Sequence, residues 1–237
     1  KYLKLEFADA VRKKLEGGYK LAKFNINPLV LTALSSGVFG ENTSVNMAKA
    51  LLYPRVLGTS ISTSFGDKMQ KMCVNYLGAS ASAVPGMDLE FTDKVDNKKR
   101  VMQLKAGPNT INFGDVEPII TEMNRAYRLL QQNKVGKNMP TFCVGITYGI
   151  IAEINGNYKK VGSSTVGAQA NIPILIGRDF WQRLTGQPNF YRELVDLFIK
   201  IFEEEDYSSL LDAGLKFLSQ QIEERYFTKK KFDPYKL

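Results

Sequence analysis

The stretch that decides the fold runs from residue 79 to residue 107, ASASAVPGMDLEFTDKVDNKKRVMQLKAG. Apolar and polar residues alternate in its two ends, residues 79–91 and 100–107, and the polar run DKVDNKK lies between them. A period of two is typical of strands, and a polar run between two such segments predicts a β-hairpin. No other part of the first half of the chain has a strand signal of this strength.

The register of this predicted hairpin decides which side chains share a face. A turn centred between Val95 and Asp96 places Asp88 directly opposite Gln103. Residues two apart on one strand, and residues directly opposed across two strands, point to the same face. The polar face then carries Asp88, Glu90, Gln103 and Lys105. The other face, which we expect to point into the core, carries Leu89, Phe91, Met102 and Leu104.

Elsewhere in the chain, helical spacing of apolar residues is the main signal. Helices are expected at residues 2–15, 44–52, 65–76, 116–132, 178–185, 191–205 and 208–226. Thr43, Ser62–Ser64 and Asp115 are expected to cap three of them. Strands are expected at residues 140–154, with YKKVG at 158–162 as a hairpin partner, and at 171–177, and the tail is expected to be irregular. This order predicts an α/β or α+β fold with helices at both ends.

Charge and the absence of histidine limit the chemistry. Lys and Arg number 32 against 24 Asp and Glu, and the resulting net charge of +8 suggests a polyanionic partner, nucleic acid or anionic lipid. The lack of histidine excludes His-based triads, HNH-type metal fingers and two-His zinc helices. No apolar run approaches ~18 residues, so no membrane segment is expected. Cys73 and Cys143 are expected to be buried free thiols of a protein in a reducing cytosol.

The polar face of the hairpin has the groups that metal-assisted phosphodiester hydrolysis needs. Mg²⁺ prefers oxygen ligands, and the Asp88 carboxylate, the Gln103 amide and the Leu104 backbone carbonyl can supply them. Lys105 can hold the attacking water or help to deprotonate it, and can offset the charge that develops on the phosphate. The alternative is that Asp88 and Lys105 form an exposed cross-strand ion pair without a catalytic role.

Two short motifs of the hairpin resemble a known nuclease signature. Pro85-Gly-Met-Asp88 followed by Gln103-Leu-Lys105 is similar to the bipartite PD-(D/E)xK motif of the superfamily that includes most type II restriction endonucleases. The helix that begins near Gly66 and the runs QLKAGPNTIN and IPILIGRDFWQRLTGQPNFY also resemble stretches of type II enzymes for interrupted, GC-rich palindromes. The resemblance covers residues 62–198.

This resemblance implies a PD-(D/E)xK core, in which helices flank a mixed central sheet, within a single nuclease domain of residues 1–237. The core is then residues 62–198, and residues 1–61 and 199–237 are helical elaborations. The resemblance also implies a Mg²⁺-dependent, sequence-specific endonuclease of a restriction–modification system, which cuts double-stranded DNA and leaves 5′-phosphate and 3′-hydroxyl ends. A palindromic site implies a homodimer, and the expected location is the cytoplasm of a bacterial or archaeal cell.

The sequence departs from the signature at two positions. Gln103 stands where relatives carry an acid, and Gln70 matches a position on the preceding helix that is acidic in many relatives. Glu90 is the first candidate to compensate as a metal ligand, and Asp67 is the candidate substitute on the helix. A repair or recombination nuclease of the same fold is one alternative function. A non-catalytic DNA-binding module, which would explain both glutamines, is another.

The loop after the second strand of the hairpin is a candidate for DNA contacts. It lacks the Gly-Lys-Ser/Thr ending of a Walker loop, so no nucleotide cofactor is expected. Asn109, Thr110 and Asn112 can instead donate hydrogen bonds to a DNA phosphate, and the alternative is that the loop is only a polar connection.

The helical segment after residue 177 is a second candidate. Arg178 and Arg183 flank Trp181 on one short element. Both arginines are candidates for phosphate or guanine contacts, whereas the tryptophan is more typical of a core position.

Overall fold

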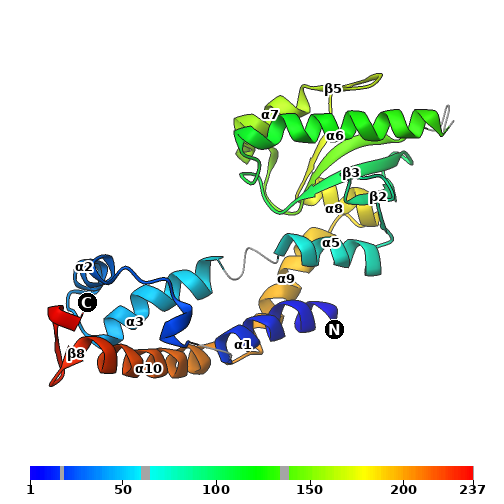
Figure 1. Ribbon diagram of the computed structural model, residues 1–237. Coiled ribbons are helices and arrows are strands. Elements are labelled where there is room, and N and C mark those ends of the chain that lie inside the picture. Colours follow the sequence, from blue (N-terminus) through cyan, green and yellow to red (C-terminus); the bar gives the residue numbers. More distant parts are fainter. Residues whose placement is uncertain (17–18, 60–64, 134–138, 237) are drawn as a thin grey trace. The chain divides into compact units, whose positions relative to one another are not determined.

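The computed structural model describes residues 1–16, 19–59, 65–133 and 139–236. The chain divides into two compact units (Figure 1): unit 1 comprises Lys1–Ser64 and Phe198–Leu237, and unit 2 comprises Phe65–Leu197. The hairpin and all the candidate site residues lie in unit 2. The expected cap Ser62–Ser64 lies outside the described residues, and the single domain over the whole chain stays a prediction.

A five-stranded mixed sheet forms the centre of unit 2, in the strand order β1-β2-β3-β4-β7. Its strands are β1 Ser80–Ala81, β2 Leu89–Thr92, β3 Lys99–Lys105, β4 Thr141–Ile146 and β7 Ile174–Ile176. β1, β2 and β3 are antiparallel neighbours, whereas β3, β4 and β7 run parallel. The C-terminal ends of β3, β4 and β7 therefore meet at one edge of the sheet. This mixed sheet, flanked by helices, confirms the predicted fold class.

The hairpin β2–β3 has the predicted register. Leu89 pairs with Met102, and the same register places Asp88 opposite Gln103. Leu89 and Met102 are fully buried, as expected for the apolar face. The predicted first strand is interrupted, because the chain turns at Gly86 with a φ of +82°, a conformation that glycine adopts without the steric cost of a Cβ. β1 and β2 are the two short strands on either side of this turn.

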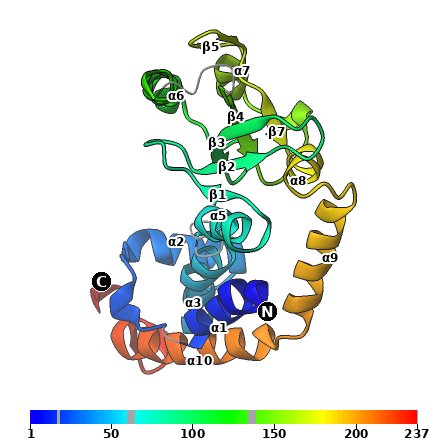
Figure 2. The ribbon, with the colours of Figure 1, turned by 90° about the vertical axis from the view of Figure 1, so that its right-hand side faces the viewer.

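Helices cover both faces of the sheet (Figures 1 and 2). On one side lie α6 Phe113–Gln132 and α7 Gly156–Gly162, and on the other lie α5 Phe65–Tyr76 and α8 Arg178–Thr185. Ile119 and Met123 of α6 are buried in one cluster with Val101 of β3 and Tyr158 of α7. Val101 and Gln103 are two apart on β3, so α6 covers the face of the strand that carries Gln103.

Two predictions for this side of the sheet are wrong. α6 begins at Phe113 rather than after an Asp115 cap, and Asp115 Oδ2 instead accepts a hydrogen bond from the Asn112 N–H at 2.7 Å. The expected hairpin partner at residues 158–162 is part of α7, because Asn155 Oδ1 accepts hydrogen bonds from two N–H groups of the first helical turn. The remaining elements of this region are η5 Ile151–Glu153, β5 Thr165–Val166 and β6 Gln169–Ala170.

An ion-pair network fastens the turn of the hairpin to α8. Asp93 is fully buried, and its Oδ2 lies 3.0 Å from Nη2 of Arg100 and 2.9 Å from Nη1 of Arg183. The Lys94 N–H also donates to the Arg183 carbonyl at 2.7 Å. Because Arg100 belongs to β3, this network holds the start of the strand that carries the candidate residues.

Unit 1 is mainly helical. Its helices are α1 Asp9–Glu16, α2 Pro28–Phe39, α3 Ser44–Tyr53 and α10 Tyr207–Tyr226, and its short helical turns are η1 Lys4–Ala8, η2 Leu21–Lys23, η3 Pro54–Thr59 and η6 Pro234–Lys236. Leu15, Leu52 and Leu218 are buried in a common core. Thr43 Oγ1 accepts a hydrogen bond from the Asn46 N–H, which confirms the predicted cap of α3. α9 Phe190–Glu203 spans the boundary between the two units.

The C-terminal tail contains regular structure, whereas an irregular tail was expected. β8 Phe227–Thr228 and β9 Lys231–Phe232 form a short hairpin. Lys229 and Lys230 occupy its tip with φ values of 49° and 62°, because a two-residue turn of this kind needs positive φ at both positions. No helix in the described part of the chain is long and apolar enough to cross a membrane.

Candidate active site

Asp88 is held in place by the strand opposite it. Its N–H donates to the Met102 carbonyl at 2.9 Å, and its Oδ2 accepts a hydrogen bond from the Leu104 N–H at 2.7 Å. The Asp88 carboxylate thus accepts a hydrogen bond from β3 that a main-chain carbonyl would accept if the ladder of the hairpin continued. Burial raises the pKa of Asp88 and the Glu122 carboxylate adds to this rise, whereas the Leu104 hydrogen bond and the Lys105 charge oppose it.

Gln103 lies opposite Asp88 and is only 8% exposed. Its Nε2 donates to the Gly86 carbonyl at 3.1 Å and to Glu122 Oε2 at 3.3 Å. Both partners are acceptors, so the amide nitrogen must face them. Among the described residues, Gln103 Oε1 is therefore buried without a hydrogen-bond partner. Such an atom is costly unless something else binds it.

Lys105 ends β3, two residues after Gln103, so both side chains point to the same face. The N–H and C=O of one strand residue point to the same side of the strand. The carbonyl of Leu104 is therefore directed to the side of Asp88, which its N–H binds. Asp88 and Lys105 form no ion pair in the described part of the chain, and the half-buried Asp88 carboxylate binds the backbone instead. The structure therefore does not support the alternative of an exposed ion pair.

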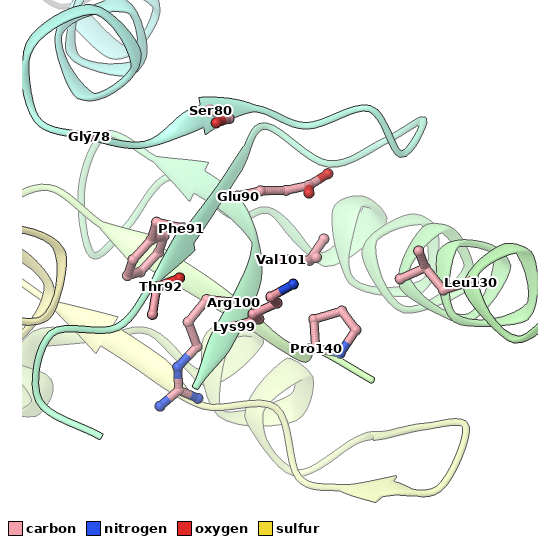
Figure 3. Close-up of a pocket in the computed structure, with 10 residues that line it drawn as sticks. All are labelled: Gly78, Ser80, Glu90, Phe91, Thr92, Lys99, Arg100, Val101, Leu130 and Pro140. Atoms are coloured by element: carbon pink, nitrogen blue, oxygen red, sulfur yellow. The ribbon is translucent and has the colours of Figure 1, made fainter. Parts of the chain in front are cut away.

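Glu90 shares the predicted polar face, but its carboxylate is engaged elsewhere. Its Oε1 accepts hydrogen bonds from Ser82 Oγ at 2.7 Å and from the Ala83 N–H at 3.0 Å. Figure 3 shows Glu90 at a separate pocket, which Lys99 and Leu130 also line. Glu90 Oε1 therefore holds the loop after β1, and compensation by Glu90 for the missing charge at position 103 stays a prediction.

The two candidates on α5 are placed differently. Gln70 Nε2 donates to the main-chain carbonyl of Asp88 at 3.4 Å, so Gln70 contacts the site through the backbone. Asp67 is exposed, and its Oδ2 lies 2.9 Å from Lys71 Nζ within the same helix. The charge of Asp67 is thus engaged within α5, and the structure does not bring it to Asp88.

Glu122 of α6 is a site residue that the sequence pattern did not single out. Its Oε2 contacts Gln103, and its charge acts on Asp88. A signal was present, because Glu122 follows Ile119 by three residues and precedes Ala126 by four, and both neighbours are buried. This spacing puts Glu122 on the face of the helix that meets the sheet. Helical spacing alone does not tell which strand residue it meets.

The side chains around Asp88 offer oxygen rather than nitrogen or sulfur ligands. Within residues 1–16, 19–59, 65–133 and 139–236, no three acidic, cysteine or histidine side chains gather where they could bind a metal. A cation here would therefore need amide and backbone oxygens beside carboxylates. Cys73 and Cys143 are free and buried, as predicted, and burial raises the pKa of each thiol to about 12. Neither is a thiolate near neutral pH.

The loop after β3 contains one side chain that holds the loop in place and two exposed side chains that can bind a ligand. Thr110 Oγ1 donates to the Gly107 carbonyl at 2.9 Å and lies 2.9 Å from the Tyr158 hydroxyl, which ties the loop to α7. Asn109 and Asn112 are exposed. These two asparagines are thus the open donors at the edge of the sheet where β3 ends, whereas Thr110 holds the loop.

The two arginines of α8 have different surroundings. Arg183 pairs with the buried Asp93, so it belongs to the network at the hairpin turn and we do not retain it as a DNA ligand. Arg178 begins α8 directly after β7, is exposed and makes no ion pair with a described residue. Trp181 is fully buried, and its Nε1 donates to the Thr147 carbonyl at 2.8 Å, which confirms the core position.

Comparison with known families agrees with this geometry. The model of the family described as type II restriction endonuclease EcoO109I matches residues 41–206, which is well over half of the chain. This match contains the whole sheet, Asp88, Gln103 and Lys105, and α6 with Glu122. No curated protein matches the chain. A DNA-binding nuclease fold is thus established, and the chain belongs to the EcoO109I family of type II restriction endonucleases.

Proposed function

We propose that this restriction endonuclease uses Mg²⁺ at Asp88 and Gln103 to hydrolyse double-stranded DNA at a specific palindromic site. The observation that carries the proposal is the buried Gln103 Oε1, which has no hydrogen-bond partner among the described residues and lies opposite the Asp88 carboxylate. The Leu104 carbonyl is directed to the same side. The neighbouring residues Asp88, Gln103 and Leu104 thus offer a carboxylate, an amide and a backbone oxygen, and hard cations such as Mg²⁺ bind such oxygens.

The residues at the site suit one divalent cation that is bound by a mixture of carboxylate, amide and backbone oxygens rather than by carboxylates alone. When bound, the cation supplies positive charge for the phosphate oxygens and for the attacking water. Asp88 holds its ligand oxygen in place through the Leu104 N–H, and Gln70 supports the Asp88 backbone. The cost of leaving Gln103 Oε1 unpaired is then offset on binding.

Lys105 is the residue that we assign to the reaction itself. Its ammonium group lies on the same face as Gln103 and is placed to hydrogen-bond the attacking water and to offset charge on the phosphate. The water oxygen bonds to phosphorus while the bond from phosphorus to the 3′ oxygen breaks. The water loses a proton to solvent, the 3′ oxygen gains one, and the ends are a 5′-phosphate and a 3′-hydroxyl.

DNA would approach the edge of the sheet where β3, β4 and β7 end. Asn109, Asn112 and Arg178 are exposed at the segments that follow β3 and β7, and they can bind phosphate or base edges. The net charge of +8 favours binding to the DNA backbone. An interrupted, GC-rich recognition sequence rests on the resemblance of the sequence to enzymes of that specificity.

A homodimer would place one active site on each strand of a palindrome. Unit 1 offers an apolar surface for self-association, because Val30, Leu34 and Val38 lie along one side of α2 and are 52%, 48% and 66% exposed. Covering such a stripe with a second copy removes apolar area from water. Sedimentation velocity of the protein and of Leu34→Glu tests this: a dimer that the substitution dissociates supports it, and a monomer contradicts it.

Digestion of a plasmid of known sequence, with Mg²⁺ or with EDTA, tests the function. Discrete fragments with mapped ends that require Mg²⁺ support the proposal. Random or structure-dependent cutting would indicate a repair or recombination nuclease. Specific binding without cutting would indicate a DNA-binding module, the alternative that Gln70 and Gln103 favour.

A further inference from the structure

We propose that Glu122 supplies the second acidic ligand of the active site and so replaces the carboxylate that position 103 lacks. The proposal rests on the function proposed above. It moves this ligand from β3 to the helix that covers the strand.

The first observation is the position of Glu122. Its Oε2 lies 3.3 Å from Gln103 Nε2, so its carboxylate reaches the side chain that stands at the place of the missing acid. Glu122 comes from α6, after the hairpin, whereas the expected supporting acids were on α5, before it. It is exposed as a residue, which suits an acid that must meet a cation and a DNA phosphate.

The turn before Asp88 leaves room for this carboxylate. A Cβ at Gly86 would lie 2.7 Å from Glu122 Oε2 and 2.9 Å from its Cδ. Any residue with a side chain would therefore displace Glu122, in addition to the strain of a φ of +82°. Glu122 thus packs directly over the turn that leads into Asp88.

The amide of Gln103 donates a hydrogen bond to Glu122, so Gln103 supports this carboxylate and does not itself supply the missing charge. Its nitrogen bridges the Gly86 carbonyl and Glu122, and its oxygen is buried and unpaired in a residue that is only 8% exposed. The Glu122 carboxylate is thus in contact with the amide group whose oxygen is unpaired. Carboxylate and amide oxygens are both ligands for a hard divalent cation.

The charges around Glu122 also favour a cation. Glu122 makes no ion pair with a residue in the described part of the chain. A carboxylate that has no basic partner is stabilised by a divalent cation bound beside it.

Metal binding by the full-length chain tests this assignment without relying on cleavage. Mn²⁺ is titrated into wild type, Glu122→Gln and Glu117→Gln, and the free ion is followed by electron paramagnetic resonance. Glu117 is an exposed acid on the same helix, so Glu117→Gln is a control for the change in charge. Glutamine at position 122 keeps an acceptor for Gln103 Nε2, so a purely positioning role would survive the substitution.

We expect Glu122→Gln to weaken Mn²⁺ binding by about tenfold or more and Glu117→Gln to leave it unchanged. The double variant Gln103→Glu/Glu122→Gln returns the carboxylate to the strand and should restore affinity to near the wild-type value. Thermal unfolding in EDTA establishes that each variant is folded.

The outcomes separate this inference from the proposed function. If wild type binds Mn²⁺ and cuts DNA while Glu122→Gln binds Mn²⁺ equally well, Glu122 is not a ligand and only this inference fails. A double variant as weak as Glu122→Gln would also contradict it. If wild type neither binds Mn²⁺ nor cuts, the proposed function itself is wrong.

Discussion

Gln103→Glu is the substitution that most directly probes the hairpin. Glutamate has the same length, but it places an oxygen where Nε2 now donates to the Gly86 carbonyl at 3.1 Å and to Glu122 Oε2 at 3.3 Å. Two hydrogen bonds become two contacts between acceptors. Without a divalent cation the variant should be less stable than wild type, and with one it should bind the cation more tightly.

The expected loss of stability in Gln103→Glu follows from the distance between Gln103 Nε2 and Glu122 Oε2. Two unit charges 3.3 Å apart repel by about 5 kcal/mol at an effective dielectric constant of about 20. The loss of stability near pH 7 cannot exceed about 4 kcal/mol, because that is the free energy needed to protonate one glutamate and so remove the repulsion. Glu122 is exposed, so solvent screens part of the repulsion. We therefore expect a loss of about 1–3 kcal/mol in the free energy of unfolding, or roughly 2–12 °C in Tm.

The dependence on pH has a definite sign. Repulsion raises the pKa of the new carboxyl group in the folded state, so the penalty is present at neutral pH and fades as the pH falls towards the unfolded pKa of about 4.3. Near pH 5, neutralising the group costs only about 1 kcal/mol, and the variant should approach the stability of wild type.

Thermal unfolding is measured for wild type, Gln103→Glu and Gln131→Glu, in EDTA and in Ca²⁺, near pH 7 and near pH 5. Gln131→Glu adds the same charge at an exposed position of α6 and should have little effect. The Mg²⁺ concentration for half-maximal cleavage should fall for Gln103→Glu. Equal stability of Gln103→Glu and wild type in EDTA, with an unchanged metal requirement, would refute the geometry described for Gln103.

Four further predictions test other parts of the molecule. Lys105→Ala should remove most cleavage but keep specific DNA binding in Ca²⁺, because its contact matters mainly in the transition state; normal cutting would contradict its role. Asp88→Asn should abolish cleavage that depends on Mg²⁺, as a plasmid assay would detect. The logarithm of the DNA association constant should fall steeply with the logarithm of salt concentration, and a flat dependence would place the +8 charge away from the DNA. Asp93→Ala removes one of the two carboxylates that pair with the buried Arg100, leaves Asp96 as the other, and should cost about 1–3 kcal/mol in urea unfolding. Burial raises the pKa of Asp93, but hydrogen bonds from the Val95 N–H, Arg183 and Arg100 outweigh this and lower it. The contribution of Asp93 should therefore be lost as the pH falls below about 4, and a wild type equally stable there would contradict it.

Local sequence patterns were sufficient to predict the hairpin and its register. The period of two and the polar turn predicted the register that joins Leu89 to Met102, because a slip by one residue would turn every apolar side chain away from the core. The same reasoning placed Asp88 opposite Gln103. Helical spacing also predicted α3, α5 and α8, and Leu52, Met69 and Leu184 on their apolar faces are buried, although Tyr76 at the end of α5 is exposed.

Contacts with neighbouring residues bear on two of the predictions. Residues 158–162 have the β-branched and aromatic character of a strand, yet Asn155 caps them as a helix and Tyr158 is buried against α6. Glu90 has the right strand parity for the site, but Ser82 and the Ala83 N–H bind its carboxylate. In both cases a neighbour in space decided between conformations that the sequence leaves open.

The sequence by itself determined the hairpin, its apolar face and the pairing of Asp88 with Gln103, since these depend on residues less than 20 positions apart and on the parity of a strand. Only the tertiary structure decided that Glu122 meets Gln103, that Arg183 is bound by Asp93 and that Arg178 remains open. Helical periodicity assigns a residue to a face but carries no information about which strand that face covers. Packing of α6 and α8 on opposite sides of the sheet supplies that information.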